Sequence, residues 1–157
     1  MSCDPHWTTY VSAFLTPTIA FFGIFIAIQQ WRTARSVAEK KLKFDLFDRR
    51  FVVYDVARNF LGSIAQSGKA KDAEISKFIS GTRESKWLLN SDIDQYFLKQ
   101  IYHKALHLQV LDAMLEGIPV GAERSANVAT QLEIKNWIID QYDVLDEKFA
   151  SFLHLEH

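Results

Sequence analysis

The chain has 157 residues, of which 48% are apolar and 24% charged, and its net charge is −1. This composition excludes a disordered chain, a collagen-like repeat and a broadly basic nucleic-acid-binding protein, so no nucleic acid partner is expected. The single cysteine, Cys3, excludes an intramolecular disulfide framework and a cysteine-rich zinc site.

The first predicted element is a membrane-spanning helix over residues 7–31, which follows a short extracytoplasmic tail, residues 1–6. No side chain from Val11 to Trp31 is ionisable. Counted from Trp7, the stretch measures roughly 37 Å as an α-helix, and a hydrocarbon core of about 30 Å needs about 20 apolar residues. The alternatives are a buried helix of a soluble core, where such long uncharged segments are rare, and a cleaved signal peptide, whose positive leading residues are missing here.

Small or polar residues recur within the predicted span at alternating spacings of four and three residues. This period of 3.5 is typical of left-handed helix packing, and helices in lipid associate by close approach through small residues. Because one span is predicted, its partner is expected to be another chain, most simply a second copy of this protein. The alternative is chance, since small residues are common in spans. The members of this seam are Thr9, Ala13, Thr16, Ala20, Gly23, Ala27 and Gln30.

A basic collar, residues 32–43, follows the predicted span and has a net charge of +4. The positive-inside rule places the N-terminus outside and the C-terminal domain in the cytoplasm. The same cations are expected to attract anionic lipid headgroups, by about 1 kcal/mol each near the surface. The collar cations are Arg32, Arg35, Lys40, Lys41 and Lys43.

Residues 44–154 are predicted to form a cytoplasmic antiparallel bundle of three long helices and one or two short ones, so the fold class is all-α. About 110 residues are enough for a core of their own. Residues 155–157 resemble the beginning of a vector-encoded tag and are expected to have no functional role. The predicted helices are, in chain order, a continuation of the spanning helix to Ser67 and Gly68, a short helix from Asp72 to the break at Gly81, a helix from Ser91 to Glu116, and a last helix from near Ala122.

Apolar residues at helical spacing predict the buried faces of these helices. Two stripes, beginning at Leu42 and Phe44, cover most of the first helix, so packing on more than one side is expected. Ser91 with Asp94 resembles a capping box. The last helix has a seam near 3.5 spacing, formed by Gln131, Ile134, Ile138, Tyr142, Leu145, Phe149 and Phe152.

The run KLKFDLFDRRFVVYDVARNFL, followed later by GTRESKWLLNSDIDQYFLKQIYHKA, resembles a group of small uncharacterised bacterial proteins. These proteins have one N-terminal span, a basic turn and a helix of the form K-L-x-x-x-L-F-D-R-R-F-x-V-Y. The resemblance covers roughly residues 15–115. It implies a bacterial inner-membrane protein with a helical cytoplasmic tail, and it brings no activity with it.

The best metal candidate is the pair His103 and His107, which share one helical face at a spacing of four residues. No acid lies between them, and Asp112 is too far round the helix to join them. A carboxylate from the last helix could complete a site, but two ordinary surface histidines are the simpler interpretation. No metal or other cofactor is therefore expected.

Two charged clusters each have a structural and a functional interpretation. The acids of the last helix form either a solvated face or an ion-binding patch. The arginines either pair with nearby acids or hold an anionic ligand, since guanidinium suits phosphate geometry. No catalytic motif or Gly-rich phosphate loop accompanies them, so no catalytic residue is predicted. The clusters are Asp140, Asp143, Asp146 and Glu147, and Arg49, Arg50, Arg58 and Arg83.

The sequence therefore predicts a non-catalytic, self-associating, membrane-anchored protein whose cytoplasmic helical domain binds a protein or small-ligand partner or senses a signal. Two alternatives stay open. One is a homo-oligomeric ion-conducting pore gated by the cytoplasmic domain, lined by the polar members of the seam and closed by its alanines and glycine. The other is a metal-dependent enzyme that uses His103 and His107.

Overall fold

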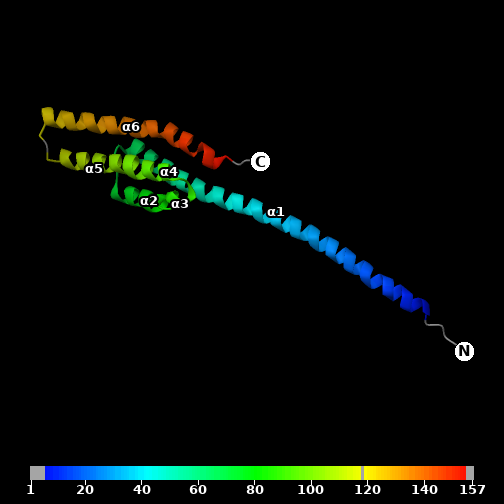
Figure 1. Ribbon diagram of the computed structural model, residues 1–157. Helices are drawn as coiled ribbons and strands as arrows, with labels where there is room; N and C mark the ends of the chain where they lie inside the picture. The colour runs from blue at the N-terminus through cyan, green and yellow to red at the C-terminus, as the bar shows by residue number, and fades with distance from the viewer. Residues whose placement is uncertain (1–5, 118, 155–157) are drawn as a thin grey trace. The chain divides into compact units, whose positions relative to one another are not determined.

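The computed structural model (Figure 1) describes the backbone of residues 6–117 and 119–154, and the side chains of residues 23–117 and 119–154. These residues form helices and the turns between them, and no β-strand occurs in these ranges. The predicted all-α fold class is confirmed. The chain divides into two compact units, Met1–Phe44 and Asp45–His157.

The first unit is made by the N-terminal part of helix α1, which spans His6–Ser67. Every side chain described from Gly23 to Phe44 is exposed. Within the described part of the chain, no helix is both long enough and apolar enough to cross a membrane. Residues 7–22, which make up most of the predicted span, lie outside the residues whose side chains are described. The membrane-spanning helix over residues 7–31 thus stays a prediction.

The second unit is a helical bundle in which α5 and α6 lie side by side and antiparallel (Figure 1). The first element of this unit is the C-terminal part of α1. A π-helical segment, η1, separates α4 from α5, where the sequence predicts one uninterrupted α-helix. The later elements are α2 (Asp72–Thr82), α3 (Ser85–Leu88), α4 (Ser91–Gln95), η1 (Tyr96–Tyr102), α5 (His103–Leu115) and α6 (Ala122–Leu153).

Helix α1 ends at Ser67, as the sequence predicts, because Gly68 takes up the left-handed conformation. Its φ is +68°, which a residue without a Cβ adopts at little cost. The Gly68 N–H donates a hydrogen bond of 2.8 Å to the carbonyl oxygen of Ile64. This bond satisfies one of the last carbonyl groups of the helix and fixes the turn toward α2.

Helices α2 and α4 begin at Asp72 and Ser91, as the sequence predicts, and their N-cap residues lie one position earlier. Lys71, not Asp72, precedes the first turn of α2, and the Asp72 carboxylate instead accepts a hydrogen bond from the Gln109 side chain on α5. Asn90, not Ser91, caps α4, since its Oδ1 accepts a hydrogen bond of 2.9 Å from the Ile93 N–H. Both asparagine and serine are good caps, so the sequence pattern alone leaves the choice open.

The core of the second unit is a chain of aromatic rings contributed by four elements. The Phe60 ring on α1 stacks on Phe78 of α2, with centroids 4.5 Å apart. Phe78 meets Phe97 of η1 edge-on at 5.6 Å, and Phe97 stacks on Phe149 of α6 at 6.1 Å. All four side chains are buried. Such ring pairs add about 0.5–1.5 kcal/mol each beyond the burial of apolar area.

The two apolar stripes predicted on α1 are buried only in their later part. Val53, Phe60 and Ile64 are buried, whereas Leu42 and Phe44 are 60% and 56% exposed. The earlier turns of α1 are exposed because the other helices of the second unit pack on the turns that follow Phe51. There Tyr54 contacts Phe149 of α6, and Phe60 stacks on Phe78 of α2.

Candidate functional site

The described part of the predicted seam is an open face of α1. Gly23, Ala27 and Gln30 are all exposed. A Cβ added at Gly23 would meet no atom within 4 Å, so this face has room for the backbone of another helix. Cys3 lies outside the residues whose side chains are described. So do the remaining members of the seam, which are Thr9, Ala13, Thr16 and Ala20.

The collar is exposed throughout and keeps most of its positive charge uncompensated. Arg35 forms an ion pair of 3.0 Å with Glu39, one turn further along α1. Both side chains of that pair are largely exposed, so it adds little stability. Among the described residues, the other four collar cations form no ion pair with a carboxylate; these are Arg32, Lys40, Lys41 and Lys43.

The pair His103 and His107 lies in surroundings that disfavour a metal cation. Both are exposed and line a shallow pocket of about 470 Å³ together with two lysines, Lys99 and Lys104. Asp112 is not available to them, because its carboxylate forms an ion pair of 3.0 Å with Lys69. In the part of the chain that the structure describes, no three His, Cys, Asp or Glu side chains come together as a metal site.

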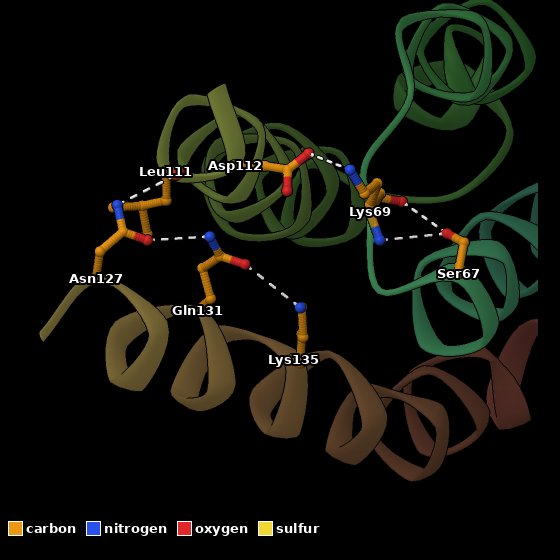
Figure 2. A network of polar contacts seen from close by, with 7 residues as sticks. All are labelled: Ser67, Lys69, Leu111, Asp112, Asn127, Gln131 and Lys135. Atoms are coloured by element: carbon orange, nitrogen blue, oxygen red, sulfur yellow. Dashed lines mark hydrogen bonds and ion pairs between the residues drawn. The ribbon is translucent and has the colours of Figure 1, made fainter. Parts of the chain in front are cut away.

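Figure 2 shows how the Lys69–Asp112 pair ties the turn after α1 to α5. Ser67 Oγ donates a hydrogen bond of 3.0 Å to the Lys69 carbonyl and holds that turn. Asn127 on α6 donates a hydrogen bond of 3.1 Å to the carbonyl of Leu111 on α5 (Figure 2). These contacts are structural, since they join the turn after α1 to α5, and α5 to α6.

Arg50 is a structural clamp of the bundle and not a free ligand-binding residue. Its Nε donates a hydrogen bond of 3.0 Å to the Leu88 carbonyl at the end of α3. One terminal nitrogen donates a bond of 3.4 Å to the Phe152 carbonyl near the end of α6, and the guanidinium carbon lies 5.7 Å from the Phe152 ring centroid. A guanidinium suits this role because it carries several donors in a fixed plane.

Arg58 belongs to a second structural cluster, with Tyr54 and Asp146. It donates hydrogen bonds of 2.6 Å both to the Tyr54 hydroxyl and to the Asp146 carboxylate. The Tyr54 hydroxyl and the Arg58 guanidinium, both hydrogen-bonded to this carboxylate, lower the pKa of Asp146. Burial and the neighbouring carboxylate raise the pKa of Tyr54.

The structure does not bring the four predicted arginines into one anion site. Arg49 and Arg83 line a shallow pocket of about 460 Å³ with Glu84, Trp87 and Leu88, while Arg50 and Arg58 are engaged elsewhere. Trp87 is 82% exposed beside this pocket. A carboxylate therefore already offsets part of the positive charge there.

The acids of the last helix do not gather around one point. Asp146 is engaged with Arg58 and Tyr54, as described above. Asp140, Asp143 and Glu147 are exposed on α6. This arrangement is that of a solvated face, which stabilises the surface of the helix and offers no grouped ligands for an ion.

Sequence reasoning missed one buried polar pair and the helix irregularity beside it. The Tyr96 hydroxyl donates a hydrogen bond of 3.0 Å to Gln141 Oε1, and both side chains are buried. Burial raises the pKa of Tyr96 well above its usual value. Tyr96 is the first residue of η1, and π-helical turns recur at functional sites. The sequence signal for this pair is Gln141, which directly precedes Tyr142 of the predicted seam, and the sequence analysis did not use it.

Comparison of the chain with models of protein families, with curated proteins and with solved structures finds no match.

Proposed function

We propose that this protein is a non-catalytic, self-associating protein of the bacterial inner membrane. Residues 7–31 would anchor it with the N-terminus outside, and its cytoplasmic helical domain would bind a partner or sense a signal. The observation that carries the proposal is a run of exposed apolar side chains in the first unit. Ile24 is 59% exposed, Phe25 61% and Ile26 52%.

Contiguous apolar side chains of this size are unfavourable in water, by about 25 cal/mol for each Å² of apolar surface. Exposed apolar patches mark surfaces that a membrane or another protein covers. The uncharged sequence from Val11 to Trp31 and the basic collar after it support a bilayer as the cover. The resemblance of residues 15–115 to bacterial single-span proteins supports the same proposal.

Self-association is supported by the open face at Gly23, Ala27 and Gln30. In lipid, small residues let two helix backbones approach closely, and a polar side chain such as Gln30 can form a hydrogen bond between helices. The clamped helices of the second unit would give a partner a stable surface. Its described residues hold no metal-binding cluster, and the proposal requires no catalysis.

The anchor is tested by carbonate extraction of membranes from bacteria that express the full chain. We expect the protein to stay in the membrane pellet. The double variant Ile24→Asp and Phe25→Asp should move it to the soluble fraction, because each charge costs about 2.5–3.5 kcal/mol near the centre of a span. Val52→Asp is the matched control, since Val52 is an exposed apolar residue of α1 outside residues 7–31. Wild-type protein in the soluble fraction would contradict the anchor.

Orientation is tested with reporters fused after His154. A reporter that is active only in the cytoplasm should be active, and a reporter that is active only in the periplasm should be silent. Neutral replacements of all five collar cations should give mixed orientation. The reverse reporter pattern in the wild-type protein would contradict the proposed topology.

A further inference from the structure

A basic pocket within the second unit is lined by residues of η1, α5 and α6. It is a shallow hollow of about 470 Å³, within the range of about 300–1,000 Å³ that small-molecule sites occupy. Neither the anchor nor self-association uses it. The residues that line the basic pocket are Lys99, Gln100, His103, Lys104, His107 and Trp137.

Positive charge gathers in the basic pocket although residues 44–157 as a whole have a net charge of −4. No carboxylate lines the pocket. Lys99 Nζ donates a hydrogen bond of 3.2 Å to the uncharged Gln95 side chain, and Lys104 Nζ lies 5.8 Å from the Trp137 ring centroid. In the described ranges, neither lysine forms an ion pair with a carboxylate.

The acids closest in sequence to the pocket's tryptophan do not line the pocket. Glu133 and Asp140 lie one turn before and one turn after Trp137 on α6, and neither lines the pocket. The lysines and histidines thus present N–H donors from two successive turns, with no carboxylate among the residues that line the pocket. Such a site attracts an anion, and one with several oxygens along its length can use donors from both turns.

We propose that the basic pocket binds a small anion that carries adjacent phosphate groups, either free diphosphate or a nucleoside diphosphate. Lysine binds phosphate oxygens as a point charge, and charge-assisted hydrogen bonds are about twice as strong as neutral ones. The Trp137 ring borders the pocket and could stack with a base. The inference rests on the proposed partner-binding role of the second unit and names the chemical class of its ligand.

The proposal is tested by calorimetric titration of the full chain, in micelles of an uncharged detergent, with pyrophosphate and with ADP. We expect binding with a Kd of about 0.1 mM or tighter. The double variant Lys99→Gln and Lys104→Gln should weaken binding at least about tenfold, because two charge-assisted contacts are lost. Lys86→Gln is the matched control, since Lys86 Nζ also lies beside a tryptophan ring, 5.4 Å from Trp87, but outside the basic pocket.

The two probes distinguish the two sources of the phosphate. ADP that binds about tenfold more tightly than pyrophosphate, with the gain lost in Trp137→Leu, supports a nucleoside diphosphate. Equal affinities support free diphosphate. The proposal is overturned if neither probe binds at millimolar concentration, or if the double lysine variant binds as well as Lys86→Gln.

Folding and anchoring are separated from binding by two further measurements. Lys99, Lys104 and Lys86 are exposed, so their variants should keep the thermal unfolding curve of the wild-type protein, as followed by circular dichroism. His103→Gln with His107→Gln provides a second pair of surface variants that should also weaken binding. A protein that binds diphosphate but fails carbonate extraction would contradict the anchor and leave the ligand assignment supported.

Discussion

The Tyr54 hydroxyl donates a hydrogen bond of 2.6 Å to the Asp146 carboxylate and so joins α1 to α6, across 92 positions of the sequence. Arg58 completes the contact with its own bonds to both groups. The Arg58 guanidinium also lies 5.3 Å from the Tyr142 ring centroid. The cluster holds the first and last helices of the second unit together at its surface, where about half of the Asp146 side chain is exposed.

Asp146→Asn should lower the free energy of unfolding at pH 7 by about 0.5–1 kcal/mol, since solvent screens this half-exposed cluster. Because the Tyr54 and Arg58 hydrogen bonds lower the pKa of Asp146, its contribution is complete above the unfolded carboxyl value of 3.8. That contribution is lost as the pH falls through the lower folded value. Urea unfolding at pH 7 and pH 3 should therefore show a smaller difference between variant and wild type at pH 3. Asp143→Asn is the control, and an equal difference at both pH values would contradict the assignment.

Arg50→Lys should destabilise the second unit by about 1–2 kcal/mol. A lysine cannot donate to the Leu88 and Phe152 carbonyls from one plane while also lying over the Phe152 ring. The change keeps the charge, so it isolates the shape of the guanidinium. Urea unfolding measures the effect, and Arg49→Lys, at an exposed neighbouring position, should change stability by less than about 0.5 kcal/mol. Equal effects of the two substitutions would show that Arg50 is no clamp.

Gly68→Ala should destabilise the protein by about 1 kcal/mol or more, because a Cβ is strained at a φ of +68°. The new Cβ would also lie 3.3 Å from Lys135 Nζ, a flexible group that can move away. Backbone strain is therefore the main cause. Gly117→Ala is the control, since Gly117 has no positive φ and its Cβ would meet no atom within 4 Å. Thermal unfolding of both variants separates the two positions, and an unchanged Gly68→Ala would contradict the cap.

Gly23→Leu should lower self-association about tenfold in detergent crosslinking. A membrane helix contact is often worth about 1–2 kcal/mol, and 1.4 kcal/mol corresponds to one factor of ten. The side chain has room within the single chain, so loss of association would not reflect misfolding. Phe25→Leu, which leaves the seam clear, is the control. Equal crosslinking in both variants would show that the spacing of the seam is coincidence. The alternative function, an ion-conducting pore, would be favoured if the protein carried ion flux in liposomes and Gly23→Leu abolished that flux.

The long-range contacts of Arg50 and Arg58 could not be predicted from the sequence. Local spacing brings Arg49, Arg50 and Arg58 onto one helix, but it gives no information about which carbonyl or carboxylate each one meets. Arg50 reaches Phe152, 102 positions away, and Arg58 reaches Asp146, 88 positions away. The alternative of one anion site for the set is not met in the described residues, because Arg50 is bonded to the carbonyls of Leu88 and Phe152 and Arg58 to the Asp146 carboxylate.

For the histidine pair, local spacing correctly predicts which residues lie together but not what surrounds them. The spacing of four residues correctly puts His103 and His107 on one helical face, in one pocket. The environment that decides what such a pocket attracts comes from Lys99 and Lys104 on the neighbouring turns and from Trp137 on another helix. A metal was expected to need a carboxylate from the last helix, and the pocket holds none.

Features that depend on local conformation and on periodic apolar patterning can be predicted from the sequence alone. Glycine in the left-handed region ends α1 at Ser67, and helical spacing identifies Ile134, Ile138 and Leu145 as core residues of α6. These features need information from a few neighbouring residues only.

Which parts of these helices are covered depends on the tertiary structure. It placed the change from exposed to buried side chains on α1 at Val53, and it inserted η1 where Tyr96 meets Gln141 of α6. The reason is that burial and pairing depend on elements far apart in the chain, and an apolar stripe that fits a core also fits a bilayer or a second helix.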